Sequence, residues 1–142
     1  MREALEPMAM ALAVERVTEF DIATAEQLLQ KISHVPDGSP EWLKLDREFH
    51  WLWYSLLPMP RLLRTIEQLL DVAQRYRAAF NLTPGMRNVS DLEHWMLLEA
   101  MKGRQAEDAK ALLQVHLRHV PTSLETPTAA NFFRTDPSDT AD

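Results

Sequence analysis

The feature of this sequence that most constrains the fold is a helical period of apolar residues between residues 39 and 58. Apolar positions there recur at three- and four-residue spacing, which places them on one face of an α-helix. That face consists of Leu43, Asp46, His50, Trp53 and Leu57. Burying an ionisable group costs solvation free energy unless the group finds a partner. We therefore predict a central helix in which Asp46 and His50 either pair with each other or share a cation with other helices.

Similar helical periods of apolar residues occur before and after this segment, and no alternation of apolar and polar residues predicts a strand. The chain has 142 residues and 46% hydrophobic content, which is enough to bury the core of one domain. We predict an all-α, antiparallel bundle of about six helices in residues 1–124, and a flexible tail in residues 125–142, which are rich in Pro, Thr, Ser and Asp. The helices are expected at about 2–17, 19–33, 40–57, 60–81, 91–103 and 105–120.

Three helix starts are predicted from capping residues. A Ser or Thr followed three residues later by an acidic residue can form a capping box, in which the two side chains satisfy free backbone amides. A Ser directly before a Pro also marks a start, because proline fits the first helical position. The predicted starts are the Thr18–Asp21 box, the Ser90–Glu93 box and the Ser39–Pro40 pair.

Two further positions affect helix ends. Gly103 is expected to end the fifth helix, since glycine is favoured just past a helix C-terminus. Pro7 removes a backbone donor, so it should kink the first helix or make Glu6 its effective start. The inward stripe of that helix is expected to be Leu5, Ala9 and Leu12.

Composition excludes several classes of protein. The chain has no cysteine, so any metal site must use histidines and carboxylates instead of thiolates. A formal charge of −6 argues against direct binding to a nucleic-acid backbone. No apolar run approaches the roughly 20 residues that a membrane-spanning helix needs. We therefore expect a cytoplasmic protein without membrane contact.

Two more histidines lie on apolar stripes. His94 shares a face with Leu97, Leu98 and Met101, and His116 lies in the stripe that runs from Ala109 to Leu117. Each could be a core histidine that is hydrogen-bonded to a carbonyl, but four buried polar groups would share one compensation if they held a metal ion. The spacing alone is compatible both with hydrogen-bonded core histidines and with a metal site. His34, in a turn, and His119, off the stripe, are expected to be ordinary exposed histidines.

Four pieces of the sequence, in this order and at workable separations, resemble a known family. The resemblance is to the C-terminal effector domain, or FCD domain, of FadR-type regulators in the GntR family, and it covers Arg2 to about Leu124. The pieces are Arg2-Glu3-Ala4-Leu5-Glu6, Asp46-x-x-x-His50, Glu93-His94, and Ala109 to Leu117 with His116-Leu117 at its end. The resemblance implies that Asp46, His50, His94 and His116 hold a divalent cation inside a helical bundle.

The resemblance also implies a sensor and not an enzyme. In such a domain a small carboxylate effector completes the coordination of the metal and alters the geometry of a homodimer attached to DNA. The winged-helix domain that contacts DNA in these regulators lies upstream and is missing from this chain, which is either a fragment of a longer regulator or a domain that stands alone. Zinc is the first expectation for the metal, and nickel, manganese and iron are alternatives. If Arg2 and Arg77 point inward, they are placed to bind a second anionic group of the effector; otherwise they form salt bridges, with Glu6 as the partner of Arg2.

Two other classes of function remain alternatives. An all-helical metalloenzyme or metal-binding protein could use the same ligands, but the sequence has no His-Asp dipeptide, no Glu-x-x-His and no His-Glu-x-x-His motif. A plain helical dimerisation module with an empty polar core is the third reading. Trp51, on the solvated side of the central helix, is expected either to contact a partner or to be covered by the tail.

Overall fold

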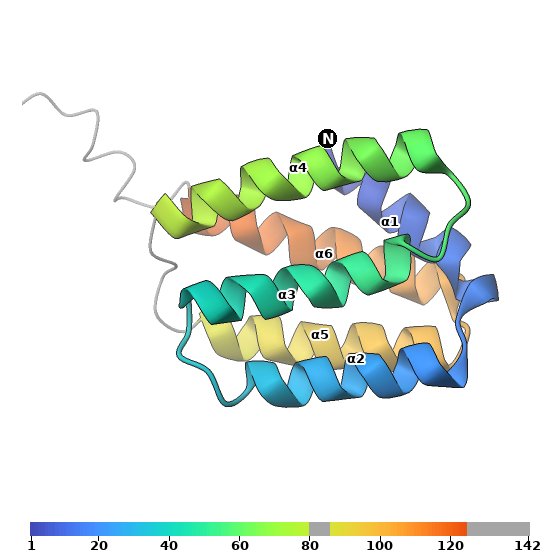
Figure 1. Ribbon diagram of the computed structural model, residues 1–142, viewed down its shortest axis with the longest axis horizontal. Helices are drawn as coiled ribbons and strands as arrows, with labels where there is room; N and C mark the ends of the chain where they lie inside the picture. The colour runs from blue at the N-terminus through green and yellow to red at the C-terminus, as the bar shows by residue number, and fades with distance from the viewer. Residues whose placement is uncertain (80–85, 125–142) are drawn as a thin grey trace, which may run out of the picture.

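The structure is a computed structural model that describes residues 1–79 and 86–124, with side chains described for residues 1–77 and 89–119. These residues form six α-helices and a short 3-10 turn, without a strand in the described ranges, which confirms the all-α prediction (Figure 1). The expected tail at 125–142 lies outside the described residues. The elements are α1 (Arg2–Ala13), η1 (Val14–Arg16), α2 (Glu19–Ile32), α3 (Pro40–Tyr54), α4 (Pro60–Ala79), α5 (Met86–Lys102) and α6 (Ala106–Leu124).

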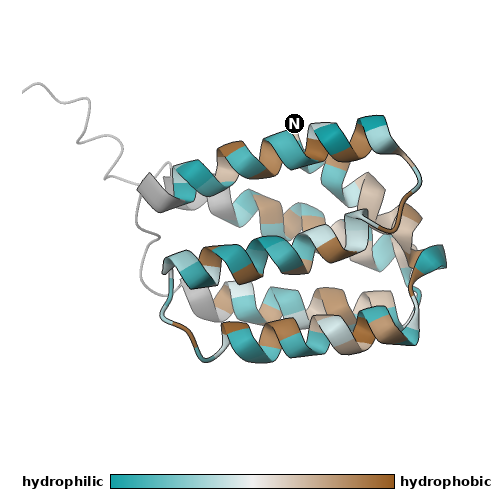
Figure 2. Ribbon diagram, viewed as in Figure 1, coloured by the Kyte–Doolittle hydropathy of each residue, from teal (hydrophilic) through white to brown (hydrophobic). Residues whose placement is uncertain are grey.

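Helix α3 lies in the middle of the bundle. It packs against α2 on one side and α4 on the other, and it also contacts α1 (Figure 1). Helix α5 packs against α2 and α6, and α1 packs along α6. Figure 2 shows hydrophilic and hydrophobic residues alternating along each helix, as expected when one face of each helix is buried. None of the described helices is long and apolar enough to cross a membrane.

The local signals that start α2 and α3 act as predicted. The Thr18 side chain accepts from the Asp21 amide, and the Asp21 carboxylate accepts from the Thr18 amide, so the capping box is complete. The Ser39 hydroxyl accepts from the Trp42 amide at 3.1 Å, and Pro40 takes the first helical position. These caps fix where the central helix begins and therefore which of its residues face the core.

The first helix differs from expectation in two ways. It runs from Arg2 to Ala13 with Pro7 inside it, so Glu6 is not its effective start. Its expected inward residue Leu12 is 47% exposed, whereas Glu6 is fully buried. The buried positions are Glu6, Pro7, Ala9, Met10 and Ala13. The face is rotated relative to the prediction because α1 is packed against α6 as well as α3, which a pattern of apolar residues alone does not reveal.

The predicted start of α5 is wrong. The helix begins at Met86, one turn before Ser90, so Ser90 lies inside the helix and cannot be its N-cap. Glu93 is buried, and it does not form a capping box. The Glu93 side chain faces the core instead, where it becomes part of the site described below.

The C-terminal end of α5 is where the sequence placed it, but another residue makes the turn. The helix ends at Lys102, and the left-handed conformation falls on Arg104, with φ of 54°, not on Gly103. The Arg104 guanidinium donates two hydrogen bonds of 3.0 Å, to the carbonyls of Val14 and Val17. These contacts, to the first residue of η1 and to the residue that follows it, compensate for the backbone strain of a non-glycine residue at positive φ.

Candidate metal centre

Four buried side chains from three helices meet inside the bundle. Asp46 and His50 come from α3, His94 from α5 and His116 from α6, and none of them is more than 4% exposed. Each offers one potential ligand atom, and these four atoms all lie within 4.8 Å of one another. A single cation could contact all four, since metal–ligand bonds to nitrogen and oxygen are about 2.0–2.2 Å long.

The helical period explains how the four side chains reach one point. Residues four apart on α3 lie on the same face, so Asp46 and His50 project together. His94 and His116 occupy the buried faces of α5 and α6, which pack against each other. The three imidazole rings form a triangle with centroid separations of 5.3 Å for His50–His94, 5.1 Å for His50–His116 and 4.8 Å for His94–His116.

Several polar atoms of this cluster have no hydrogen-bond partner among the described residues. They are Oδ1 of Asp46, Nδ1 of His50, and both ring nitrogens of His94. Nε2 of His94 lies 3.1 Å from Oδ1 of Asp46, and Nε2 of His50 lies 3.7 Å from the same oxygen. The 3.1 Å approach of His94 to Asp46 lacks the geometry of a hydrogen bond. Buried polar atoms are normally hydrogen-bonded, so a cluster in which one ligand atom from each of four residues converges and several polar atoms lack a bond fits a cation.

The electrostatics of the cluster leave Asp46, His50 and His116 in the protonation states that metal binding requires. Burial holds the pKa of His50 well below its ordinary value and lowers the pKa of His116, which keeps both imidazoles neutral at pH 7. Burial alone would raise the pKa of Asp46, but Arg77 and the neighbouring imidazoles hold that pKa well below its ordinary value. A neutral imidazole cannot form an ion pair, so the Asp46–His50 contact does not by itself compensate for their burial.

Glu93 is a member of the site that sequence reasoning missed. Its Oε2 lies 2.6 Å from Nδ1 of His116, and its other carboxylate oxygen contacts His119. If His116 donates its Nδ1 proton to this carboxylate, Nε2 remains as the nitrogen that faces a metal. The spacing of Glu93, Leu97 and Ala100, which are all buried, was the signal that could have placed Glu93 on the inner face. His119, expected to be ordinary and exposed, is 39% exposed at its side chain and contacts Glu93.

The two arginines proposed for the effector have buried carboxylate partners. Arg77 donates to Oδ2 of Asp46 at 2.6 Å, and its guanidinium lies 4.8 Å from the centroid of the Trp42 ring. Arg2 donates through Nε to Oε1 of Glu6 at 2.5 Å, which is the salt bridge that the sequence offered as the alternative. Both arginines line a crevice of about 10 Å³ beside Asp46, which is room for about one water molecule.

Comparison with known proteins places this chain in a family. The profile of the FCD domain family matches residues 1–119. The Nta operon transcriptional regulator of Aminobacter aminovorans is 28% identical over 127 residues, which are 88% of this chain and 59% of that protein. The HTH-type transcriptional repressor NanR of Klebsiella aerogenes is 25% identical over 122 residues, which are 84% of this chain and 47% of NanR. The chain thus spans about half the length of the curated relatives it matches.

Solved structures show the same fold. E. coli McbR/YncC superposes with a TM-score of 0.76 and 26% sequence identity, over 87% of this chain and 64% of that one. A transcriptional regulator described as a GntR family member, from Pseudomonas syringae pv. tomato, also has a TM-score of 0.76, over 91% of this chain and 54% of its own length. Its identity of 24% supports the fold alone.

Proposed function

This chain belongs to the FCD domain family, and we propose that it is the metal-dependent effector-binding part of a GntR-family transcriptional regulator. The observation that carries the metal proposal is the convergence of four buried ligand atoms, one each from Asp46, His50, His94 and His116, within 4.8 Å of one another. Three nitrogens and one carboxylate oxygen suit zinc first, and also nickel, manganese or iron(II). The bound cation would accept a carboxylate oxygen from a small organic acid as a further ligand.

The protein's own residues orient this site. Glu93 holds the ring of His116 through Nδ1, and Arg77 holds the carboxylate of Asp46 through Oδ2, so the other oxygen of Asp46 stays directed at the imidazoles. Second partners of this kind fix the orientation of metal ligands and raise metal affinity. We propose that Arg77 and Arg2, which both line the crevice beside Asp46, also attract the negative charge of the effector.

The proposed role is regulatory and not catalytic. Both curated relatives are named as a transcriptional regulator or repressor, and the family match covers most of the described chain. In this proposal residues 1–124 form the cytoplasmic sensing unit, residues 125–142 form a tail, and DNA is contacted by a winged-helix domain, not by this acidic segment. We propose that the unit acts as a homodimer, since most soluble oligomers are closed assemblies of identical chains and two-fold dimers are the commonest.

Exposed apolar side chains support the homodimer. Leu92 is 63% exposed and Val115 is 46% exposed, and both line an apolar groove of about 1030 Å³ between α5 and α6. Trp51, for which the sequence suggested a contact either with a partner or with the tail, is half-buried against the core. Light scattering at tens of micromolar should give twice the mass of the chain, and Leu92→Glu should reduce that mass. A monomeric parent protein would contradict the dimer.

Elemental analysis tests the metal directly. Protein purified without chelators should contain about one divalent cation per chain, and calorimetry should show that a small carboxylate binds the metal-loaded protein more tightly than the metal-stripped protein. Linkage then requires the carboxylate to raise metal affinity by the same factor. A metal-free protein whose melting temperature does not respond to zinc, nickel or manganese would overturn the proposal.

A further inference from the structure

The four ligand residues of the candidate metal centre are almost fully shielded from solvent. None of them is more than 4% exposed. A cation therefore reaches them only past other residues of the bundle. Two sides can be compared: the α3–α4 side, where a crevice adjoins Asp46, and the α5–α6 side, where Glu93 contacts His116. The side chains on each side decide which of them admits a cation.

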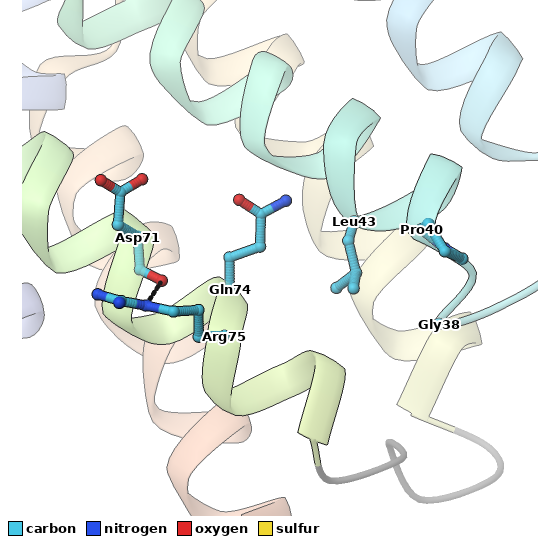
Figure 3. Close-up of a pocket in the computed structure, with 6 residues that line it drawn as sticks. All are labelled: Gly38, Pro40, Leu43, Asp71, Gln74 and Arg75. Carbon is cyan, nitrogen blue, oxygen red and sulfur yellow. Dashed lines mark hydrogen bonds between the residues drawn. The ribbon is translucent and has the colours of Figure 1, made fainter.

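The α3–α4 side is unfavourable for the passage of a cation. A surface groove of about 670 Å³ lies there, and Figure 3 shows Gln74 projecting from α4 on the side facing α3, with Leu43 pointing from α3 toward α4. A crevice of about 10 Å³ shares these two residues with the groove, and Arg2, Arg47 and Arg77 line it. It has room for about one water molecule. Arginine side chains have no acceptor atom, so the three of them offer a cation no ligand on this side.

On the α5–α6 side a chain of potential ligand atoms leads from the cluster to the surface. Nδ1 of His116 lies 2.6 Å from Oε2 of Glu93, and Oε1 of the same carboxylate contacts Nδ1 of His119. The side chains are 4% exposed for His116, 11% for Glu93 and 39% for His119, so exposure rises at each step outward. Imidazole nitrogens and carboxylate oxygens are the atoms that zinc and similar cations bind.

The two outer side chains are suited to take up a cation. Burial alone would raise the pKa of Glu93, but the hydrogen bond to His116 and the charges of the neighbouring histidines hold that pKa below its ordinary value. The carboxylate is therefore ionised at pH 7. Nδ1 of His119 contacts it without the geometry of a hydrogen bond. A cation between the two side chains would give this nitrogen a bond that it lacks.

We propose that Glu93 and His119 form an uptake site, which captures a divalent cation at the surface and passes it through His116 to the buried cluster. This uptake site presupposes the metal centre, so it rests on the proposed function. Glu93 exchanges its hydrogen bond with His116 for the cation, and the freed His116 ring turns outward, binds the cation and carries it inward. His119 lies one turn beyond Val115 on α6, so the exposed end of the uptake site lies past the residues of α6 that line the apolar groove.

Stopped-flow kinetics on the metal-free full chain test the uptake site. Cobalt(II) is the probe, because its visible absorbance follows binding and it accepts the same ligand types as zinc. His119→Gln keeps a donor for Glu93 but loses the ring nitrogen, so binding, and release to excess chelator, should both slow by about fivefold or more. The dissociation constant should stay within about twofold of the parent value, because a group that acts only on the route changes both rates by the same factor.

Three further variants serve as rescue and controls. His119→Glu supplies another side chain that binds metals, so it should restore the parent rates. His34→Gln, the same change at an exposed histidine in the turn after α2, should keep the parent rates. Arg47→Gln removes one arginine from the crevice on the α3–α4 side and should also keep them.

The outcomes separate the uptake site from the proposed function. Parent-like rates in His119→Gln would overturn the uptake site and leave the metal centre standing. Faster release with weaker affinity in that variant would also overturn it, because this is the result expected if His119 only orients Glu93. Faster binding in Arg47→Gln would place the route on the α3–α4 side instead. If neither cobalt nor zinc binds the parent protein, the metal centre fails, and the uptake site fails with it.

Discussion

Two aspartate–arginine pairs join α3 to α4 in opposite directions, and they differ in almost every other respect. Asp46 of α3 accepts from Arg77 of α4, and Arg47 of α3 contacts Asp71 of α4. Asp46 has a 5% exposed side chain, whereas that of Asp71 is 51% exposed. Adjacent residues of one helix thus form one pair inside the bundle and one at its surface.

The comparison shows how burial assigns different functions to the same chemistry. In the inner pair Asp46 still has an oxygen without a hydrogen bond, and it points at imidazoles that also lack partners. Such a site is incomplete, so it favours a cation. In the outer pair water can replace either partner, so the contact is weak and exchangeable. The inner pair is therefore held in place by burial, whereas the outer pair can exchange with solvent.

The largest expected effect tests the comparison itself. Asp46→Ala leaves the Arg77 guanidinium buried without its carboxylate, so it should lower the free energy of unfolding of metal-free protein by about 3–5 kcal/mol. Asp71→Ala, the matched change in the outer pair, should lower it by only about 0–1 kcal/mol. Urea unfolding of both variants measures the difference. Equal losses would show that burial does not distinguish the two pairs.

Metal binding should add stability only through the inner site. Zinc at 100 times its dissociation constant should raise the free energy of unfolding by about 2.7 kcal/mol. His94→Ala should lose this increment because it removes a ligand, and His34→Ala, at an exposed histidine, should keep it. Thermal unfolding with and without zinc is the measurement. An undiminished zinc response in His94→Ala would exclude His94 as a ligand.

Glu93 should tune the same site without touching the metal. Glu93→Gln keeps the shape of the side chain but removes the charge that holds His116, so zinc affinity should fall about 10- to 100-fold, or about 1.4–2.7 kcal/mol. Glu99→Gln changes an exposed carboxylate of the same helix and is the control. Competition with a zinc-binding dye measures both variants. An unchanged zinc affinity in Glu93→Gln would show that the His116–Glu93 hydrogen bond does not support metal binding.

The smallest expected effect, expressed per pH unit, is the pH dependence of the free energy of unfolding. Burial lowers the pKa of His50 and of His116 in the folded protein, so below the unfolded-state value of 6.5 the unfolded chain binds more protons. Stability of metal-free protein should therefore fall as pH drops below about 6.5, by up to about 1.4 kcal/mol per pH unit for each histidine. Urea unfolding from pH 8 to pH 5 measures the slope.

Two variants test which histidines cause this pH dependence of stability. His50→Gln should remove about one histidine's share, because the glutamine does not titrate, and the exposed His34→Gln should leave the slope unchanged. A pH-independent stability in the parent protein over this range would contradict neutral burial of both imidazoles.

Local sequence signals determined most of the helices. The Thr18–Asp21 box and the Ser39–Pro40 pair start α2 and α3 where predicted, since a cap depends on residues within four positions of each other. The helical period also placed Asp46 and His50 on a buried face, because residues four apart project together whatever surrounds them. The family resemblance, carried by those residues, is confirmed by the match over residues 1–119.

Only the tertiary structure decided which atoms meet. The Ser90–Glu93 spacing is compatible with a cap, yet one more helical turn and the nearness of His116 made Glu93 a buried partner of an imidazole. Arg104, and not Gly103, adopts the left-handed turn, because carbonyls some 90 positions earlier in the chain hold its guanidinium. Spacing within a helix fixes the direction in which a side chain projects. Contacts with other helices then set the burial and the charged partners of that side chain, and these decide which aspartate–arginine pair is buried and rigid and which is exposed to exchange with water.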